Sequence, residues 1–152
     1  MNETNVPATR EVIHVGQLEI RYVKEADGAC QMACFELRAP PNSNVTPHSH
    51  SASEELGYVL EETLPCTVGS EMRDLQPGDA VATPRGVVHA FSNPHAAVAR
   101  ALVINTPDIG TDYFEQVGSI INASGPPDRV ALLATMRRFG LKPVTLPETP
   151  QR

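Results

Sequence analysis

Three histidines and a glutamate in the middle of the chain are residue types that bind metal ions. His48 and His50 occupy alternate positions, so in an extended backbone both imidazoles point to the same face. A carboxylate follows at Glu55, and a further imidazole lies at His89. Imidazole and carboxylate ligands together suit divalent iron, manganese, nickel, copper or zinc. The four side chains form a site for one such ion if the fold brings them together.

The ligand types also indicate what kind of site this would be. No thiolate is among them to favour a closed structural zinc site. Four protein ligands on a six-coordinate ion leave positions for water, dioxygen or a chelating substrate, which is typical of a catalytic site. The alternatives are a solvated strand end, or a site that has kept these residues and lost its metal. We favour metal binding because all four candidate ligands are present together.

The rest of the chain must position these residues, and its pattern predicts strands. Fourteen prolines and ten glycines separate short apolar runs in a chain of 152 residues. Regularly spaced short strands with such turns indicate a sandwich or barrel. In the run 30–38, apolar residues alternate on both faces, which predicts a strand covered on both sides. The expected strands are 11–15, 17–23, 30–38, 46–50, 55–61, 66–68, 72–75, 80–83, 88–92 and 98–105.

The C-terminal part has helical spacing instead. Residues 112–121 carry apolar side chains at helical intervals, and a second helix follows the segment Ser124-Gly125-Pro126-Pro127-Asp128 and ends at Gly140. We expect both helices to cover one mouth or face of the β body. The predicted organisation is an N-terminal segment 1–9, a β domain 10–106, a helical extension 107–143 and a tail 144–152.

Two motifs in this order resemble those of the cupin superfamily. The first is His48-x-His50-x4-Glu55, and the second is Gly78-x5-Pro84-x-Gly86-x2-His89-x3-Asn93. The resemblance extends from Pro47 to Asn93 and implies an all-β jelly roll or barrel, here with short C-terminal helices. It also implies that His48, His50, Glu55 and His89 converge on one metal ion, and that the protein is a homodimer.

The first motif departs from the family pattern at one position. Glu62 stands where these proteins usually carry a glycine. Glu62 must then accept a positive φ, at a cost on the order of 1 kcal/mol, or the turn is rebuilt around Pro65. This position is not among the expected ligands.

Alternation from the expected ligands gives a provisional substrate pocket. If Glu55 and His89 point inward, so do Gly57, Val59 and Phe91. Such an apolar wall favours an aromatic or otherwise planar organic substrate over a phosphorylated sugar. The first hypothesis is therefore a metal-dependent dioxygenase that resembles quercetin dioxygenase-like cupins and acts on a small enol or aromatic compound. The alternatives are a binding or sensor module without turnover and, less favoured, a sugar isomerase.

Composition limits the partners. A net charge of −6 and scattered basic residues argue against nucleic acid or an anionic membrane as partner. The three cysteines show no C-x-x-C spacing, and no signal or spanning segment is evident. We expect a reduced, cytoplasmic protein that binds a small molecule.

Several other residues receive structural rather than functional predictions. We expect His14, His95 and Arg85 at the surface, and Tyr58 and Met72 in the core. Asn93 is expected to close its turn with side-chain hydrogen bonds. The cysteines Cys30, Cys34 and Cys66 are expected to be small buried hydrophobic residues.

Overall fold

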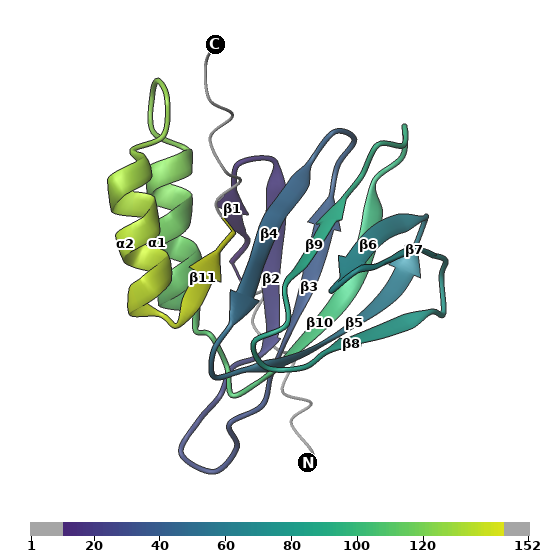
Figure 1. Ribbon diagram of the computed structural model, residues 1–152, viewed down its shortest axis with the longest axis horizontal. Coiled ribbons are helices and arrows are strands. Elements are labelled where there is room, and N and C mark those ends of the chain that lie inside the picture. Colours follow the sequence, from purple (N-terminus) through teal and green to yellow (C-terminus); the bar gives the residue numbers. More distant parts are fainter. Residues whose placement is uncertain (1–10, 145–152) are drawn as a thin grey trace, which may run out of the picture.

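The protein is a sandwich of two antiparallel sheets with two helices packed on one side (Figure 1). The computed structural model describes residues 11–144. Within these residues no strand pairing joins the two sheets, so the jelly roll is open rather than a closed barrel. The expectation of an all-β fold with short C-terminal helices is confirmed.

Each sheet combines strands that are distant in sequence. The first sheet has the order β1-β2-β3-β10-β5-β8, and the second has the order β11-β4-β9-β6-β7. The strands of the first sheet are Ile13–Val15 (β1), Leu18–Lys24 (β2), Ala33–Ala39 (β3), Ala99–Thr106 (β10), Glu54–Glu61 (β5) and Ala80–Thr83 (β8). Those of the second are Leu141–Pro143 (β11), Asn44–His50 (β4), His89–Ser92 (β9), Leu64–Val68 (β6) and Glu71–Leu75 (β7).

The core lies between the sheets and follows the period-two pattern of the strands. Along β10 every second residue is buried, from Ala99 to Asn105, which is the alternation expected of a strand with one face inward. The main core cluster contains Leu18, Ile20, Tyr22, Ala33, Phe35, Leu37, Ala39, Val59, Leu64, Leu75, Ala99, Ala101 and Val103.

Strand β3 is covered on one face only, so the prediction of cover on both sides was wrong. Phe35 and Leu37 face the core, whereas Glu36 lies on the outer face. There the Glu36 carboxylate accepts hydrogen bonds from Arg21 (2.8 Å) and Arg100 (2.7 Å). Charge pairing at the surface therefore replaces the apolar cover that the sequence pattern suggested.

The turn after β5 shows how the chain accommodates Glu62. Its backbone has φ 61, in the left-handed region that favours glycine. Of the two alternatives predicted for this turn, the strained φ is therefore the one observed.

The two helices form a second, smaller apolar cluster beside the sandwich. Helix α1 spans Thr111–Ile121 and helix α2 spans Arg129–Arg138. The two prolines expected in the first turn of the second helix precede it, and Asp128 is its N-cap, accepting a hydrogen bond from the backbone of Ala131 (3.0 Å). Neither helix is long and apolar enough to cross a bilayer, and this holds for all of residues 11–144.

Helix α1 packs very closely on β1. A Cβ atom at Gly118 would lie 2.5 Å from the backbone oxygen of His14, so only glycine fits there. The Asn122 side chain strengthens this contact, donating to the same His14 oxygen (2.7 Å) and accepting from the backbone N–H of Gly16 (2.9 Å). These contacts fix the helical layer to the edge of the first sheet.

The short strand β11 follows the helices and was not anticipated. Its residues Leu141 and Pro143 pair with His50 and His48 of β4. The C-terminal extension therefore adds a strand directly beside the strand that carries two of the predicted ligands.

Candidate metal centre

The strands bring His48, His50, Glu55 and His89 together between the two sheets. His48 and His50 lie on β4, and His89, the first residue of β9, is paired directly with His48. Glu55 reaches the same place from β5 in the opposite sheet. All three histidines are buried, and the Glu55 side chain is 17% exposed.

The distances within this cluster suit one small ion. One ring nitrogen from each histidine lies within 4.8 Å of the others. Glu55 Oε2 lies 3.0 Å from His89 Nε2, and Glu55 Oε1 lies 3.8 Å from His50 Nε2. The 3.0 Å contact lacks the alignment of a hydrogen bond, so it is an electrostatic contact.

Backbone carbonyls orient two of the imidazoles. His48 Nδ1 lies 2.8 Å from the oxygen of Thr46, and His89 Nδ1 lies 3.2 Å from the oxygen of Val87. A carbonyl only accepts, so both Nδ1 atoms carry the proton and the Nε2 lone pairs remain free for the cluster.

The remaining ring nitrogens provide a test of whether a cation fits here. His89 Nε2 and both nitrogens of His50 are buried without a hydrogen-bond partner among the described residues. A buried polar atom without a partner is costly, and a coordinated cation would satisfy those that face the cluster. The residues therefore fit a divalent ion.

The electrostatics favour neutral imidazoles at His48 and His50 and an ionised carboxylate at Glu55. Burial lowers the pKa of His50 to about 4, and burial together with the neighbouring His89 lowers the pKa of His48. Burial would raise the pKa of Glu55, but its contacts with His89, His50 and His48 outweigh it and the pKa is lowered. For His89, burial is outweighed by Glu55, so its pKa is raised. Metal ions bind imidazole and carboxylate in their deprotonated forms, which three of the four groups already favour.

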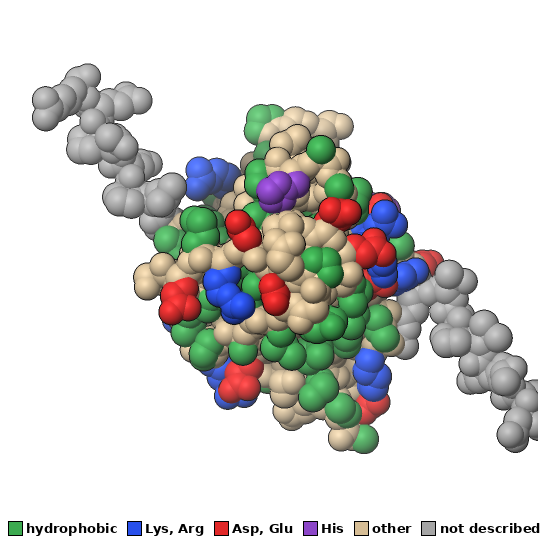
Figure 2. Space-filling view, turned by 90° about the vertical axis from the view of Figure 1, so that its right-hand side faces the viewer, with side chains coloured by type: hydrophobic (Ala, Val, Ile, Leu, Met, Phe, Trp, Pro, Cys, Tyr) green, Lys and Arg blue, Asp and Glu red, His purple; other side chains and the backbone are tan. Residues whose placement is uncertain are grey.

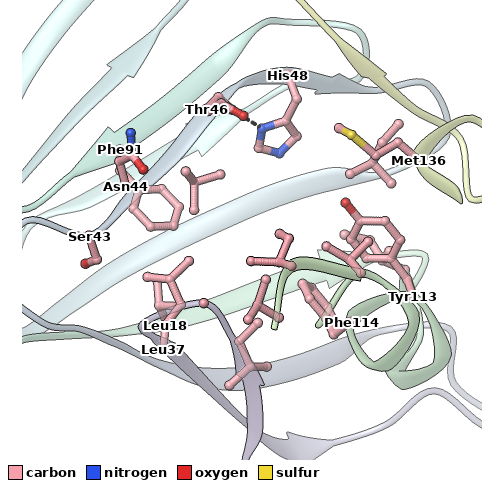
Figure 3. A pocket seen from close by; sticks show the side chains of 18 of the residues that line it. Leu18, Leu37, Ser43, Asn44, Thr46, His48, Phe91, Tyr113, Phe114 and Met136 are labelled. Atoms are coloured by element: carbon pink, nitrogen blue, oxygen red, sulfur yellow. Dashed lines mark hydrogen bonds between the residues drawn. The ribbon is translucent and has the colours of Figure 1, made fainter. Parts of the chain in front are cut away.

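A pocket of about 450 Å³ opens beside the cluster (Figure 3). His48, His50 and Glu55 lie in its wall, together with side chains from both sheets and both helices. Most of the other lining side chains are apolar, and none of the lining residues is a lysine or arginine. A volume and lining of this kind are typical of sites for small organic molecules.

Comparison with known proteins identifies the family. A protein-family model described as "Cupin domain" matches residues 35–105, which include all four clustered residues. Residues 35–105 of the chain form a cupin domain. No curated protein matches the sequence.

Solved cupins and related proteins share this fold. An RmlC-like cupin from Shewanella frigidimarina has a TM-score of 0.62 and 16% identity, over 74% of this chain and 96% of that chain. The polyketide cyclase RemF from Streptomyces resistomycificus has a TM-score of 0.58 and 25% identity, over 65% of this chain and 75% of that one. A sugar phosphate isomerase from Silicibacter pomeroyi has a TM-score of 0.56 and 26% identity, over 62% of each chain.

The three residues expected to line the cupin pocket divide between two cavities. Phe91 borders both the large pocket and a second cavity of about 30 Å³. Gly57 and Val59 line only the small cavity. Alternation along β5 places both on its inner face, but beside the small cavity rather than the large pocket.

The helices contribute pocket residues that sequence reasoning missed. Tyr113 and Phe114 of α1 and Met136 of α2 line the large pocket. Their helical spacing predicts the two helices but does not show which side chains reach the pocket. The only signal for their position was the expectation that the helices cover one mouth or face of the β body.

Other residues singled out in the sequence lie away from the cluster. His14 and His95 are exposed, as predicted, and so is Arg85, which donates to the backbone oxygen of Ala52 (2.8 Å). Asn93 closes its turn as predicted, donating to the oxygens of Ala39 (2.7 Å) and Ala97 (2.8 Å) and accepting from the backbone of His95 (3.0 Å).

Two predictions about burial were wrong. Tyr58 and Met72 are exposed, at 41% and 77%, because both side chains lie on outer faces of their sheets. Among the cysteines, Cys30 is exposed in the loop before β3, whereas Cys34 and Cys66 are partly buried. Figure 2 shows acidic and basic side chains intermixed on the face that it presents, with no concentration of basic residues there.

Proposed function

We propose that this cupin is an enzyme that holds one divalent transition metal on His48, His50, Glu55 and His89. Its substrate would be a small, mainly apolar enol or aromatic compound, and the reaction an oxidation by dioxygen. The observation that carries the proposal is the convergence of four potential ligands, three of which lie in the wall of a pocket lined by no lysine or arginine.

Charge balance at the metal ion supports an enol as the substrate group that reaches the ion. Three neutral imidazoles and one carboxylate contribute a single negative charge against the two positive charges of the ion. The remaining positive charge favours an anionic oxygen, and the bound ion would supply Lewis acidity that lowers the pKa of an enol or phenol. In a dioxygenase reaction both oxygen atoms enter the organic product, so the proposal requires no external reductant.

The residues of the chain would perform the remaining tasks. The carbonyls of Thr46 and Val87 keep two imidazoles in the tautomer that presents Nε2 to the ion. Phe91 and the apolar side chains around it would hold the ring system of the substrate and exclude water from it.

Cyclisation is a second candidate reaction, because one of the similar solved structures is a cyclase. The polyketide cyclase RemF is 25% identical and has a TM-score of 0.58. A cyclisation without oxygen uptake in the same pocket is therefore the second candidate. A sugar phosphate isomerase is 26% identical, but a phosphate group would favour lysine or arginine in the wall, and neither is among the residues that line this pocket.

Elemental analysis tests the metal centre. Wild-type protein should carry close to one equivalent of a divalent transition metal, and His89→Ala should lose most of it. His95→Ala is the matched control, because it removes an exposed histidine outside the cluster. Equal metal content in the wild type and His89→Ala would refute the site.

Substrate screening tests the reaction. Metal-replete protein would be mixed with flavonols, β-diketones and related chelating enols, while an oxygen electrode and mass spectrometry follow the mixture. Oxygen uptake with a gain in mass of two oxygen atoms supports the dioxygenase. A product formed without oxygen uptake supports the cyclase. Tight binding of a compound with neither change indicates a binding or sensor module instead.

A homodimer is also proposed, through the outer face of β5 and β10. Leu56 and Tyr58 are exposed on β5, and their register partners on β10 are Ile104 and Leu102. This apolar strip borders an ion-pair network in which Arg21 and Arg100 balance Glu36 and Glu61, so a second copy can meet it without net repulsion. Sedimentation equilibrium of Tyr58→Lys beside the wild type is the test, and the wild type should be a dimer that the variant weakens. A monomeric wild type, or a variant that dimerises as tightly as the wild type, would contradict the proposal.

A further inference from the structure

Helix α1 brings a phenol group into the pocket from outside the family-matched residues. Tyr113 lies beyond residues 35–105 and is 7% exposed. Its ring packs against Phe114, with centroids 5.1 Å apart, and against Phe139, with centroids 5.5 Å apart. The ring is therefore held in one position by its neighbours rather than by its hydroxyl group.

The hydroxyl group of Tyr113 faces the pocket and has no hydrogen-bond partner within residues 11–144. Figure 3 shows the oxygen directed away from α1, toward the side of the pocket where His48 and Met136 lie. Tyr22 differs, because its hydroxyl donates to Asp108 at 3.0 Å. Burial raises the pKa of Tyr113 to about 12, so the phenol remains a hydrogen-bond donor at neutral pH.

This hydroxyl is a polar group in an otherwise apolar part of the pocket wall. The other lining side chains from the helical side of the pocket carry no hydroxyl, amide or charged group. They are Ile109, Phe114, Val117, Ile121, Pro127, Leu132, Met136 and Leu141. The side-chain hydroxyl and amide groups of Ser43 and Asn44 lie near Phe91, at the opposite side of the pocket in Figure 3.

We propose that Tyr113 is a specificity residue whose phenol donates a hydrogen bond to a second oxygen atom of the substrate. The inference rests on the proposed function, in which a first oxygen reaches the histidine cluster. The substrate would then be an apolar, mainly aromatic molecule with oxygen atoms at two separated positions. A compound without the second oxygen would leave the Tyr113 hydroxyl buried and unpaired, which reduces affinity about 10-fold.

Two flavonols test this, because they share the chelating hydroxy-ketone and differ elsewhere. The probe 3-hydroxyflavone has no further hydroxyl group, whereas kaempferol carries additional ring hydroxyls. Titration calorimetry on metal-replete wild type should show kaempferol binding about 10-fold more tightly. Tyr113→Phe should lose this preference and keep its affinity for 3-hydroxyflavone and its metal content.

Tyr22→Phe is the matched control, because it removes the same hydroxyl group from a tyrosine that does not line the pocket. It should retain the preference of the wild type. An unchanged preference in Tyr113→Phe, equal weakening toward both probes, or a wild type that binds neither flavonol would overturn the inference. Metal analysis of the same samples separates these results from failure of the proposed function, which would appear as wild-type protein without metal.

Discussion

Replacing Glu62 with glycine should stabilise the protein. Glu62 sits at φ 61 in the turn between β5 and β6, and its side chain is exposed. A left-handed conformation costs a non-glycine residue about 1–2 kcal/mol in the folded state. Glycine removes this strain but gives the unfolded chain more freedom, which costs about 0.4–1 kcal/mol. The net gain in the free energy of unfolding should therefore be about 0.5–1 kcal/mol.

Urea denaturation of the metal-free protein measures this gain. For a chain of this size, Glu62→Gly should raise the denaturation midpoint at an unchanged m-value, and should raise Tm by about 1–4 °C. The control is Glu62→Ala, which removes the carboxylate but keeps the Cβ atom that causes the strain. It should match the wild type. If alanine stabilises as much as glycine, the carboxylate rather than the backbone is responsible, and the reasoning fails.

Three further predictions concern the turn after β9, the helix contact and the metal. Asn93→Ala removes three hydrogen bonds of a buried amide and should lower the free energy of unfolding by about 2–4 kcal/mol. Urea titration measures this loss, and a loss below about 1 kcal/mol would contradict the prediction. Gly118→Ala forces a Cβ atom against the His14 oxygen and should lower the free energy of unfolding by about 1–3 kcal/mol in the same assay. The control Ser119→Ala, on the exposed side of α1, should leave the free energy of unfolding unchanged or raise it. Chelation should lower the stability of the wild type by about 2.7 kcal/mol if free metal was at 100 times its Kd, and should leave His89→Ala unchanged in a thermal scan.

The strands and the shared face of His48 and His50 could be predicted because local pattern determines them. The alternation in β2 and β10, with proline and glycine in the turns, marks the strands without knowledge of the tertiary fold. The spacing His48-x-His50 guarantees a shared face once β4 is extended. The pairing of His48 with His89, however, was available only through the resemblance to cupins, since strand partners are not determined by local sequence.

Features that depend on partners distant in sequence were missed or predicted wrongly. Strand β11 has only three residues and no periodicity, and it is a strand because β4 offers it an edge. The core assignment of Tyr58 followed from residue type, although alternation from Val59 places its side chain on the outer face. The position of a residue on the pleat outweighs its hydrophobicity, because the sheet has only one inward face here.

The division of the pocket between two stretches of sequence has an evolutionary consequence. The three histidines and Glu55 come from strands β4, β9 and β5 inside the sandwich, whereas one wall of the pocket comes from α1 and α2. The helical pair is fixed to the sandwich by contacts of Gly118, Asn122 and β11, and these contacts do not involve Tyr113, Leu132 or Met136. Selection can therefore exchange Tyr113, Leu132 or Met136 and so change the shape of the pocket, while the four clustered residues are inherited intact.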